Sequence, residues 1–335
     1  MKKLKMILSW VILSLILQCS VLFFLDKFYF KDNTNVNMEQ VKIDDNHVNT
    51  NMHVHIPDNA KDIKVSYDAK YVAYYEDKAL KVCNTNTGDV DVLKNSEGRV
   101  ILRSIWLQDR NKLLTLEVED GEIVLYNYDA QKQTDQKIVD ICPYKANYKN
   151  FDIQVSTITG VTYIQINNAI YRIDINQSFA TNVPLAVQSL GSVSVMPTKD
   201  RLVYVAKKGT VIHMTQPVSR IPIDSNEQIE ILGIDEDGYV YVGQIKNNLV
   251  DGIIKKNLDN INSKSEKIKL DKPVEKSNIF INGKGQIYVN NPSKKVVKEI
   301  KSSAEIKYKG NFVAYYSNGV ASILDGKFYR TNFTK

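Results

Sequence analysis

The sequence has few of the residues on which most enzyme active sites depend. It holds four histidines, three cysteines and two tryptophans among 335 residues, and His213 is the one histidine beyond residue 55. A hydroxyl nucleophile needs a base within hydrogen-bond reach, usually histidine, and no G-x-S-x-G elbow occurs. His213 lies between Ile212 and Met214, which predicts a packed or surface-lying side chain. The sequence therefore predicts a protein that is not an enzyme, without catalytic or cofactor-binding residues.

Scarce cysteine also excludes a disulfide-rich domain. No C-x-x-C pair occurs, so the sequence offers neither a redox motif nor a zinc knuckle. Beyond the first 25 residues only Cys83 and Cys142 remain, and two thiols permit at most one disulfide. Spacing leaves two interpretations open, one disulfide or two separately buried thiols.

Proline and glycine are sparse as well, with 8 and 15 residues, which excludes collagen-like and low-complexity chains. Hydrophobic residues make up 43% of the chain and charged residues 24%, as in ordinary globular proteins. The chain is therefore long and apolar enough to bury a sizeable core.

One long hydrophobic run stands at the N-terminus. Met6 to Leu25 contains no charge, and about 20 residues at about 1.5 Å each match a hydrocarbon core about 30 Å thick. Three lysines precede the run, whereas one acidic and one basic residue follow it and nearly cancel. We therefore predict a single-pass protein of the cell membrane, with residues 1–5 in the cytoplasm, a transmembrane signal-anchor at 6–25 and an extracytoplasmic remainder.

Two alternatives compete with a retained anchor. A cleaved signal peptide shares the basic start and the apolar run, but its apolar region is shorter and a small-x-small cleavage site follows it. A lipoprotein signal would use Cys19, yet Gln18 occupies the position that requires a small residue. The retained anchor is the preferred prediction.

Residues 26–60 are rich in Asn and Asp and show no sustained period, which predicts a polar spacer. The segment contains one candidate metal site, composed of His47, His53, His55, Asp44 and Asp45. A flexible tether does not preorganise ligands, so we predict no metal site here.

From residue 61 to residue 335 the sequence predicts an all-β domain. Short segments of β-branched and aromatic residues recur between turn signals, and no amphipathic helix interrupts them. The repeated unit is a turn followed by an apolar strand. It is marked by Tyr71, Leu113, Thr162, Leu202, Tyr239, Ile287 and Phe312.

The spacing of these landmarks predicts a β-propeller. The intervals between them are 42, 49, 40, 37, 48 and 25 residues, and a four-stranded propeller blade takes roughly 40 to 50 residues. The last interval is too short for a blade, which leaves six or seven blades. Two β-sandwich domains are the structural alternative.

The two ends of this domain are the most alike. KVSYDAKYVAYYEDKALKV at Lys64 to Val82 and EIKYKGNFVAYYSNGVASI at Glu305 to Ile323 share one tyrosine and the sequence VAYY. With these turns and apolar strands the chain resembles the TolB-like and WD-repeat β-propeller superfamily, as a membrane-anchored bacterial member, although no Trp-Asp or Gly-His pair occurs. The resemblance implies that YVAYY and FVAYY are inner strands, and that the ring is an interaction platform.

Two further segments are similar to known binding loops. Asp235 to Gly238 (DEDG) groups carboxylates, but it lacks the distant Glu of an EF-hand loop, and Asp-Gly predicts a hairpin turn. Ser156 to Tyr163 is similar to the S-x-D-x-G-x-T-W turn of sialidase-type propellers, with Ile158 and Tyr163 at the Asp and Trp positions. Because the carboxylate is missing, we predict no sialidase site.

The formal net charge is +6, and lysines gather late in the chain. They are Lys255, Lys256, Lys264, Lys267, Lys269, Lys272, Lys276, Lys294, Lys295, Lys298, Lys301, Lys307 and Lys309. Such a face would meet an anionic wall polymer or lipid headgroups. The alternative is that lysine protects solvated blade edges from strand pairing. Nucleic acid is not expected as a partner, because the domain is predicted to lie outside the cell.

The predicted function is a non-catalytic, membrane-anchored extracytoplasmic interaction module, whose partner is a protein or an anionic envelope polymer. This prediction follows from an anchor, a spacer and a repeat domain without a catalytic constellation. The alternatives are a regulatory or sensory partner of another membrane protein, and a hydrolase or lyase acting on wall carbohydrate.

Overall fold

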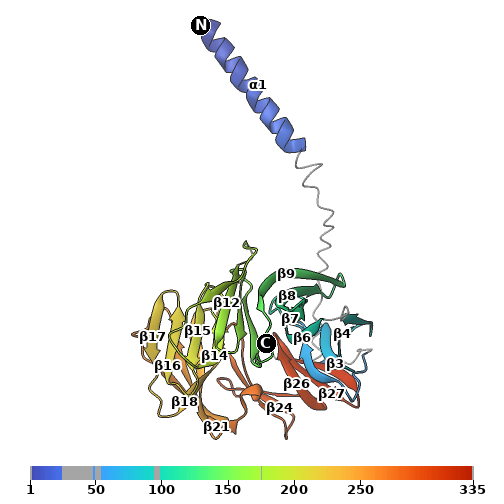
Figure 1. Cartoon of the computed structure of the whole chain (residues 1–335), viewed down its shortest axis with the longest axis vertical. Coiled ribbons are helices and arrows are strands. Elements are labelled where there is room, and N and C mark those ends of the chain that lie inside the picture. Colours follow the sequence, from blue (N-terminus) through green and yellow to red (C-terminus); the bar gives the residue numbers. More distant parts are fainter. Residues whose placement is uncertain (1, 25–47, 50–53, 94–98, 175, 334–335) are drawn as a thin grey trace. The chain divides into compact units, whose positions relative to one another are not determined.

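The computed structural model describes residues 2–24, 48–49, 54–93, 99–174 and 176–333 (Figure 1). The chain divides into two compact units, Met1–Asp45 and Asn46–Lys335. The first unit contains one helix and the second contains the strands.

The helix of the first unit is α1 (Lys2–Phe24). It forms because its run of Leu, Ile and Phe contains neither proline nor glycine, the two residues that break helices. Within the part of the chain that the structure describes, no helix is both long and apolar enough to cross a membrane. The anchor predicted at 6–25, whose last residue lies outside the described residues, is therefore not supported.

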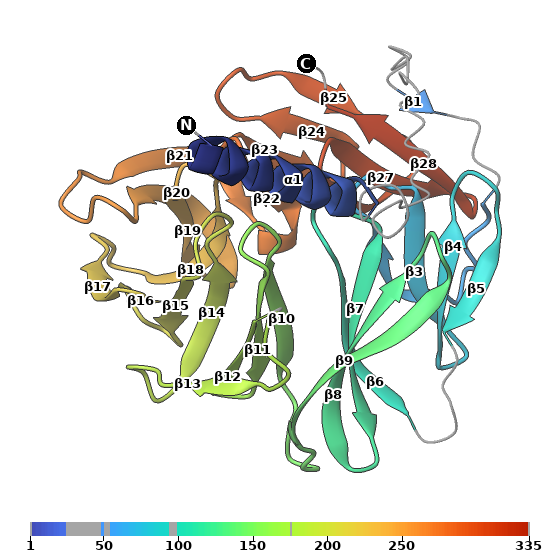
Figure 2. The same cartoon turned by 90° about the horizontal axis from the view of Figure 1, so that it is seen from above.

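The second unit consists of four-stranded antiparallel sheets, and the described residues form seven of them. Seen from above, the sheets follow one another around a ring (Figure 2). Blade 1 contains β2 (Lys61–Val65), β3 (Tyr71–Glu76), β4 (Ala79–Asn84) and β5 (Val90–Leu93). Blade 2 contains β6 (Val100–Trp106), β7 (Lys112–Glu119), β8 (Glu122–Asp129) and β9 (Thr134–Pro143). Blade 3 contains β10 (Phe151–Ser156), β11 (Val161–Ile166), β12 (Ala169–Asp174) and β13 (Thr181–Val183).

The second half of the ring repeats this arrangement. Blade 4 contains β14 (Leu190–Val195), β15 (Leu202–Ala206), β16 (Val211–Thr215) and β17 (Val218–Pro222). Blade 5 contains β18 (Gln228–Ile234), β19 (Tyr239–Lys246), β20 (Leu249–Asn257) and β21 (Glu266–Val274). Blade 6 contains the 3-10 helix η2 (Lys276–Asn278), β22 (Ile279–Ile281), β23 (Ile287–Asn291), β24 (Val296–Glu299) and β25 (Glu305–Lys307). Blade 7 contains β26 (Asn311–Tyr316), β27 (Gly319–Leu324), β28 (Lys327–Asn332) and β1 (Val48–Asn49).

The first strand of each blade is the inner strand. β2, β6, β10, β14, β18 and β22 contact one another in succession around the ring, and β26 contacts β2. The architecture is therefore a β-propeller, as predicted, with seven blades out of the six or seven expected, and not two β-sandwiches.

Apolar side chains between the blades make up the core. Seven clusters of buried residues each join two neighbouring blades. Leu116 of blade 2 and Ile164 of blade 3, for example, are both fully buried in one cluster. Each such side chain contributes about 1.5 to 3 kcal/mol relative to exposure, so the ring is stabilised mainly where one blade packs on the next.

The N-terminal segment closes the ring. β1 pairs with β28 as the outermost strand of blade 7, and Ile56 donates a backbone hydrogen bond to the Gly326 carbonyl at 2.8 Å. Val54 and Ile56 are buried in the cluster between blades 7 and 1. The described part of residues 48–60, predicted to be spacer, thus belongs to the ring. Both ends of the chain therefore build blade 7, because the C-terminal residues supply only three of its strands.

The similar sequences YVAYY and FVAYY do not form equivalent strands of their blades. YVAYY forms β3, the second strand of blade 1, whereas FVAYY lies in β26, the inner strand of blade 7. The expectation that both are inner strands is wrong for β3. The first and second strands of a blade are both enclosed by neighbours, so similar apolar sequences suit either position.

Candidate functional site

Charged side chains gather on the inner strands of three adjacent blades. Lys64 and Asp62 of β2 form an ion pair of 2.5 Å between Nζ and Oδ2. Arg103 of β6 reaches Asp152 of β10 with 3.4 Å between Nη2 and Oδ1. Gln154 donates to the other oxygen of Asp152 at 2.7 Å. We call these five residues the inner-strand network.

The network continues into a polar layer between blades 1 and 2. Lys64 Nζ also lies 2.9 Å from the hydroxyl oxygen of Ser104, which is fully buried. Thr115, equally buried, donates to Glu117 Oε1 at 2.5 Å. Burial raises the pKa of the Tyr75 phenol, which hydrogen-bonds Ser104, to about 12. Polar groups thus lie beside the apolar cluster that joins these two blades.

Two ionisable groups of this layer are shifted toward their neutral forms. Burial lowers the pKa of the Lys64 ammonium, and the bond to Asp62 only partly opposes the shift. Burial likewise raises the pKa of the Glu117 carboxyl, against the effects of Thr115 and Arg99. Perturbed pKa values of opposite sense in one region are typical of functional sites, and also occur in structural networks.

The backbone is irregular where the network lies. The pairing of β2 with β3 shifts register between Lys61 and Lys64, and that of β6 with β7 shifts between Ile101 and Arg103. Between the first two residues, Asp62 has a φ of 49°, which a short polar side chain tolerates better than most. β-bulges re-aim side chains and are frequent next to active sites. The bulges of β2 and β6 thus interrupt the regular alternation of side chains beside Lys64 and Arg103.

A second set of charges extends from this layer over blade 2. The Arg99 guanidinium lies 3.4 Å from Glu117 and 3.2 Å from Asp135, and 4.4 Å from the centre of the Tyr126 ring. Tyr126 donates to Glu119 Oε2 at 2.7 Å. Arg99 Nε lies 3.8 Å from Glu119 Oε1, so three carboxylates surround one guanidinium. Burial raises the pKa of Asp135 despite its contact with Arg99.

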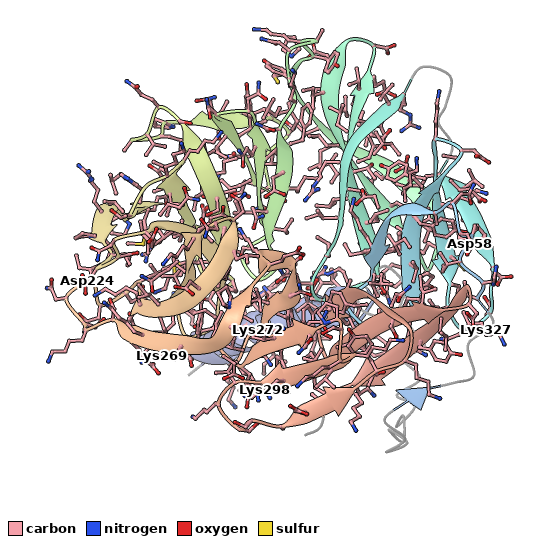
Figure 3. The ribbon with its side chains drawn as sticks, turned by 90° about the horizontal axis from the view of Figure 1, so that it is seen from below. Asp58, Asp224, Lys269, Lys272, Lys298 and Lys327 are labelled. Carbon is pink, nitrogen blue, oxygen red and sulfur yellow. The ribbon has the colours of Figure 1, made fainter. Side chains whose placement is uncertain are left out.

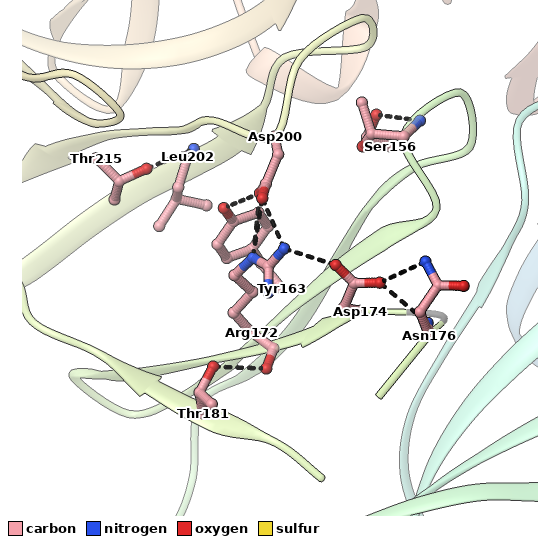
Figure 4. A network of polar contacts seen from close by, with 10 residues as sticks. Ser156, Tyr163, Arg172, Asp174, Asn176, Thr181, Asp200, Leu202 and Thr215 are labelled. Atoms are coloured by element: carbon pink, nitrogen blue, oxygen red, sulfur yellow. Dashed lines mark hydrogen bonds and ion pairs between the residues drawn. The ribbon is translucent and has the colours of Figure 1, made fainter. Parts of the chain in front are cut away.

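A third polar group joins blades 3 and 4, and it is shown in Figure 4. Arg172 contacts Asp200 at 2.7 Å and Asp174 at 2.9 Å. Tyr163 donates to Asp200 Oδ1 at 2.6 Å. Burial opposes ionisation of Asp200, but the bonds from Arg172 and Tyr163 outweigh it and lower its pKa. The arrangement is an interblade clamp, which explains the sialidase-like turn: Tyr163 is buried and holds a neighbouring blade.

The other residues singled out in the sequence lie in packed or turn positions of the ring. His213 is 5% exposed and stacks on Tyr204 with 5.2 Å between ring centres. Burial, assisted by Arg220, lowers the pKa of its imidazole. Asp235 lies in the turn between β18 and β19, where it accepts a bond from Tyr241 at 2.9 Å.

The remaining candidates are metal ligands and thiols. His47, His53, Asp44 and Asp45 lie outside the described residues, and His55 is exposed beside β28. Cys83 is buried and Cys142 half-buried, and both are free thiols. Of the two interpretations of the cysteines, the structure has the separate thiols.

The sequence had not singled out the inner-strand network. Its members come from three separate segments of the chain, and no motif connects them. One signal was present, because Arg103 interrupts a strand that is otherwise largely apolar. A charge within such a strand is expensive to bury unless it is paired.

Comparison with known proteins supports the fold. No protein-family model matches the chain, and no curated protein matches it. Among solved structures it is similar to an oligogalacturonate lyase from Vibrio parahaemolyticus, with 12% identity, a TM-score of 0.57, and coverage of 86% of this chain and 97% of that one. A chain of the mitotic checkpoint complex is similar with 12% identity and a TM-score of 0.55, over 90% of this chain and 98% of that one. At this identity the likeness shows the fold alone: the chain is a seven-bladed β-propeller.

Proposed function

We propose that the protein is a non-catalytic interaction module that binds a protein partner through the inner-strand network. The observation that supports this most is the order of the charges. Asp62, Lys64, Arg103 and Asp152 follow one another along three neighbouring inner strands as one carboxylate, two cations and one carboxylate. A uniformly charged polymer would be repelled by one of the two signs, whereas a protein surface can present the complementary pattern.

Arg103 is the member best suited to bind a ligand. Its side chain is 41% exposed, and its contact with Asp152, at 3.4 Å, is long for a charged hydrogen bond. Its buried Nε has no hydrogen-bond partner among the described residues. A guanidinium offers five donors, so Arg103 retains donors for a carboxylate or carbonyl of the partner.

The module is proposed to lie outside the cell, on the strength of the N-terminal sequence alone. Three lysines precede the uncharged run and one lysine follows it closely, which favours a cytoplasmic N-terminus. A partner that is itself a membrane protein would make the module regulatory or sensory.

Site-specific photo-cross-linking in cells tests the proposed binding site. A cross-linking amino acid replaces Lys61, beside the network, or Ile158, which is 67% exposed in the turn between β10 and β11 at the other end of the blades. We expect one discrete protein adduct from position 61 and none from position 158. Addition of Arg103→Ala should abolish the adduct. Equal labelling from both positions would contradict a site at the network.

A carbohydrate lyase is the second candidate, and one observation favours it. Lys64, with its lowered pKa, and Arg103 lie on adjacent inner strands. In β-elimination on a uronate, a base removes the C5 proton, a cation stabilises the carboxylate, and the C4–O bond breaks to leave an unsaturated sugar. Lys64 and Arg103 would take these two roles.

Turnover distinguishes the two candidates. The purified full-length chain is incubated with polygalacturonate, and the absorbance of the unsaturated product is followed. If the protein is an interaction module, the wild-type chain should produce no more absorbance than a Lys64→Met variant. Catalytic turnover by the wild type that this variant lacks would replace the binding proposal with the lyase.

A further inference from the structure

The positive charge of the protein is concentrated in one stretch. Residues 264–309 contain twelve lysines and five acidic residues, a net charge of +7, which exceeds the +6 of the whole chain. This stretch supplies β21, the outermost strand of blade 5, and nearly all of blade 6. The excess charge therefore lies where the edges of two neighbouring blades meet.

A pocket of about 280 Å³ lies between those edges. Val274, Val289, Val296 and other apolar side chains form its walls. Three ammonium groups and two carboxylates also line it; they belong to Lys272, Lys294, Lys298, Asp271 and Glu305. Figure 3 shows Lys269, Lys272 and Lys298 close together along the adjoining strands.

Most of this charge is not neutralised. Lys269, Lys272 and Lys294 form no ion pair with any residue that the structure describes. Lys298 contacts Asp271 at 2.7 Å, but that carboxylate is 77% exposed. Pairs so open to water contribute little to stability, so a ligand anion can replace Asp271 without destabilising the ring.

The chemistry of the patch favours a polymer in water over a lipid surface. Proteins that lie on membranes combine lysines with apolar side chains that insert between the lipids. Among the described residues, no large apolar side chain between 264 and 309 is exposed. The apolar groups here line the pocket, where they can contact part of a polymer repeat.

The choice of cation points to phosphate. The stretch 264–309 contains no arginine. Arginine suits the flat bidentate geometry of a carboxylate, whereas lysine acts as a point charge and is a common phosphate binder. Lysines without arginine therefore match a tetrahedral anion that approaches from variable directions.

We propose that the edges of blades 5 and 6 bind a linear phosphodiester polymer, with Lys272, Lys294 and Lys298 pairing with its phosphates. The polyol part of one repeat enters the pocket. Phosphates on either side of that repeat extend the contact to Lys269 and Lys295. The site is separate from the inner-strand network, which lies on blades 1 to 3.

Fluorescence anisotropy with labelled poly(glycerol phosphate) oligomers and the full-length chain tests the proposal. We expect Lys272→Gln/Lys294→Gln to weaken binding about tenfold or more, because each lysine near an anionic ligand contributes appreciably. The matched control is Lys207→Gln/Lys208→Gln, which removes the same charge from an exposed turn of blade 4 and should leave binding unchanged. Equal weakening by both double variants would overturn the assignment.

Two further variants test the ion pair at the pocket and the shape of the pocket. Asp271→Asn frees Lys298 and should strengthen binding, while Leu270→Trp narrows the pocket and should weaken binding without a change of charge. Binding that Leu270→Trp leaves unaltered would show charge attraction only and contradict the pocket. Tighter binding of polygalacturonate, or of vesicles containing phosphatidylglycerol, would contradict the phosphodiester polymer.

Discussion

Truncation of Ile56 to alanine tests whether the N-terminal segment closes the ring. Ile56 is 2% exposed and packs with Val72 of blade 1 and Phe328 of blade 7. The change removes three carbons, worth about 0.8 kcal/mol each in transfer, and leaves a cavity that raises the cost of such changes to about 2 to 5 kcal/mol. Its backbone bond to Gly326 remains. We therefore expect a loss of about 3 kcal/mol, a large share of the roughly 5 to 15 kcal/mol of a folded domain.

Urea unfolding of the full-length chain measures this loss, as a lower midpoint with an unchanged slope. Ile158→Ala is the matched control, because the same atoms are removed from a side chain that is 67% exposed. It should change the free energy of unfolding by less than about 0.5 kcal/mol. Equal midpoints for the two variants would refute closure by residues 54–56.

Three further predictions concern pH, the interblade clamp with an exposed ion pair as its control, and the N-terminus. The lowered pKa of His213 means that the folded state resists protonation of this side chain. The contribution of His213 to stability is therefore full above pH 6.5, the ordinary pKa, and falls as the pH drops below it. His213→Leu should flatten this dependence in urea melts at successive pH values. Asp200→Asn leaves Arg172 partly buried with one fewer carboxylate, and should cost about 1 to 3 kcal/mol in the same assay. Asp224→Asn removes an exposed pair and should cost under about 1 kcal/mol. Removal of residues 1–25 should release the protein from the membrane fraction; a full-length chain that is already absent from that fraction would refute the anchor.

The sequence was sufficient to predict the ring. Each blade repeats a turn followed by an apolar strand. The spacing of about 40 residues reflects the four strands and their turns that make up one blade. Six of the seven landmarks, from Tyr71 to Ile287, fall at or next to the start of the second strand of a blade. Phe312 falls on a first strand instead, which is why the last interval was short.

The blade count could not be predicted, because blade 7 is assembled from both ends of the chain. Its fourth strand, β1, contains only Val48 and Asn49, within a segment rich in Asn and Asp. Asn and Asp are poor strand formers, so the local sequence resembles a spacer. Pairing with β28 is determined by tertiary contacts such as the burial of Val54 and Ile56.

The two candidate sites differ in how visible they were. The lysines of residues 264–309 stood out as a run of one charge, although the pocket between blades 5 and 6 did not. The inner-strand network was hidden, because its charges come from three separate strands that no motif connects. Only the ring brings β2, β6 and β10 together, and the bulges in β2 and β6 change the alternation of side chains next to Lys64 and Arg103.

The most direct test of the inner-strand network is a calorimetric titration with the partner protein that photo-cross-linking identifies. The free partner is titrated into two variants of the chain. Asp152→Asn removes an arginine-paired carboxylate within the network, and Asp174→Asn removes one from the interblade clamp. The two side chains are similarly exposed, Asp152 at 27% and Asp174 at 23%. We predict that Asp152→Asn weakens binding about tenfold, or about 1.4 kcal/mol, while Asp174→Asn binds as tightly as the wild type. Undiminished binding by Asp152→Asn, or an equal loss in both variants, would contradict the proposed site.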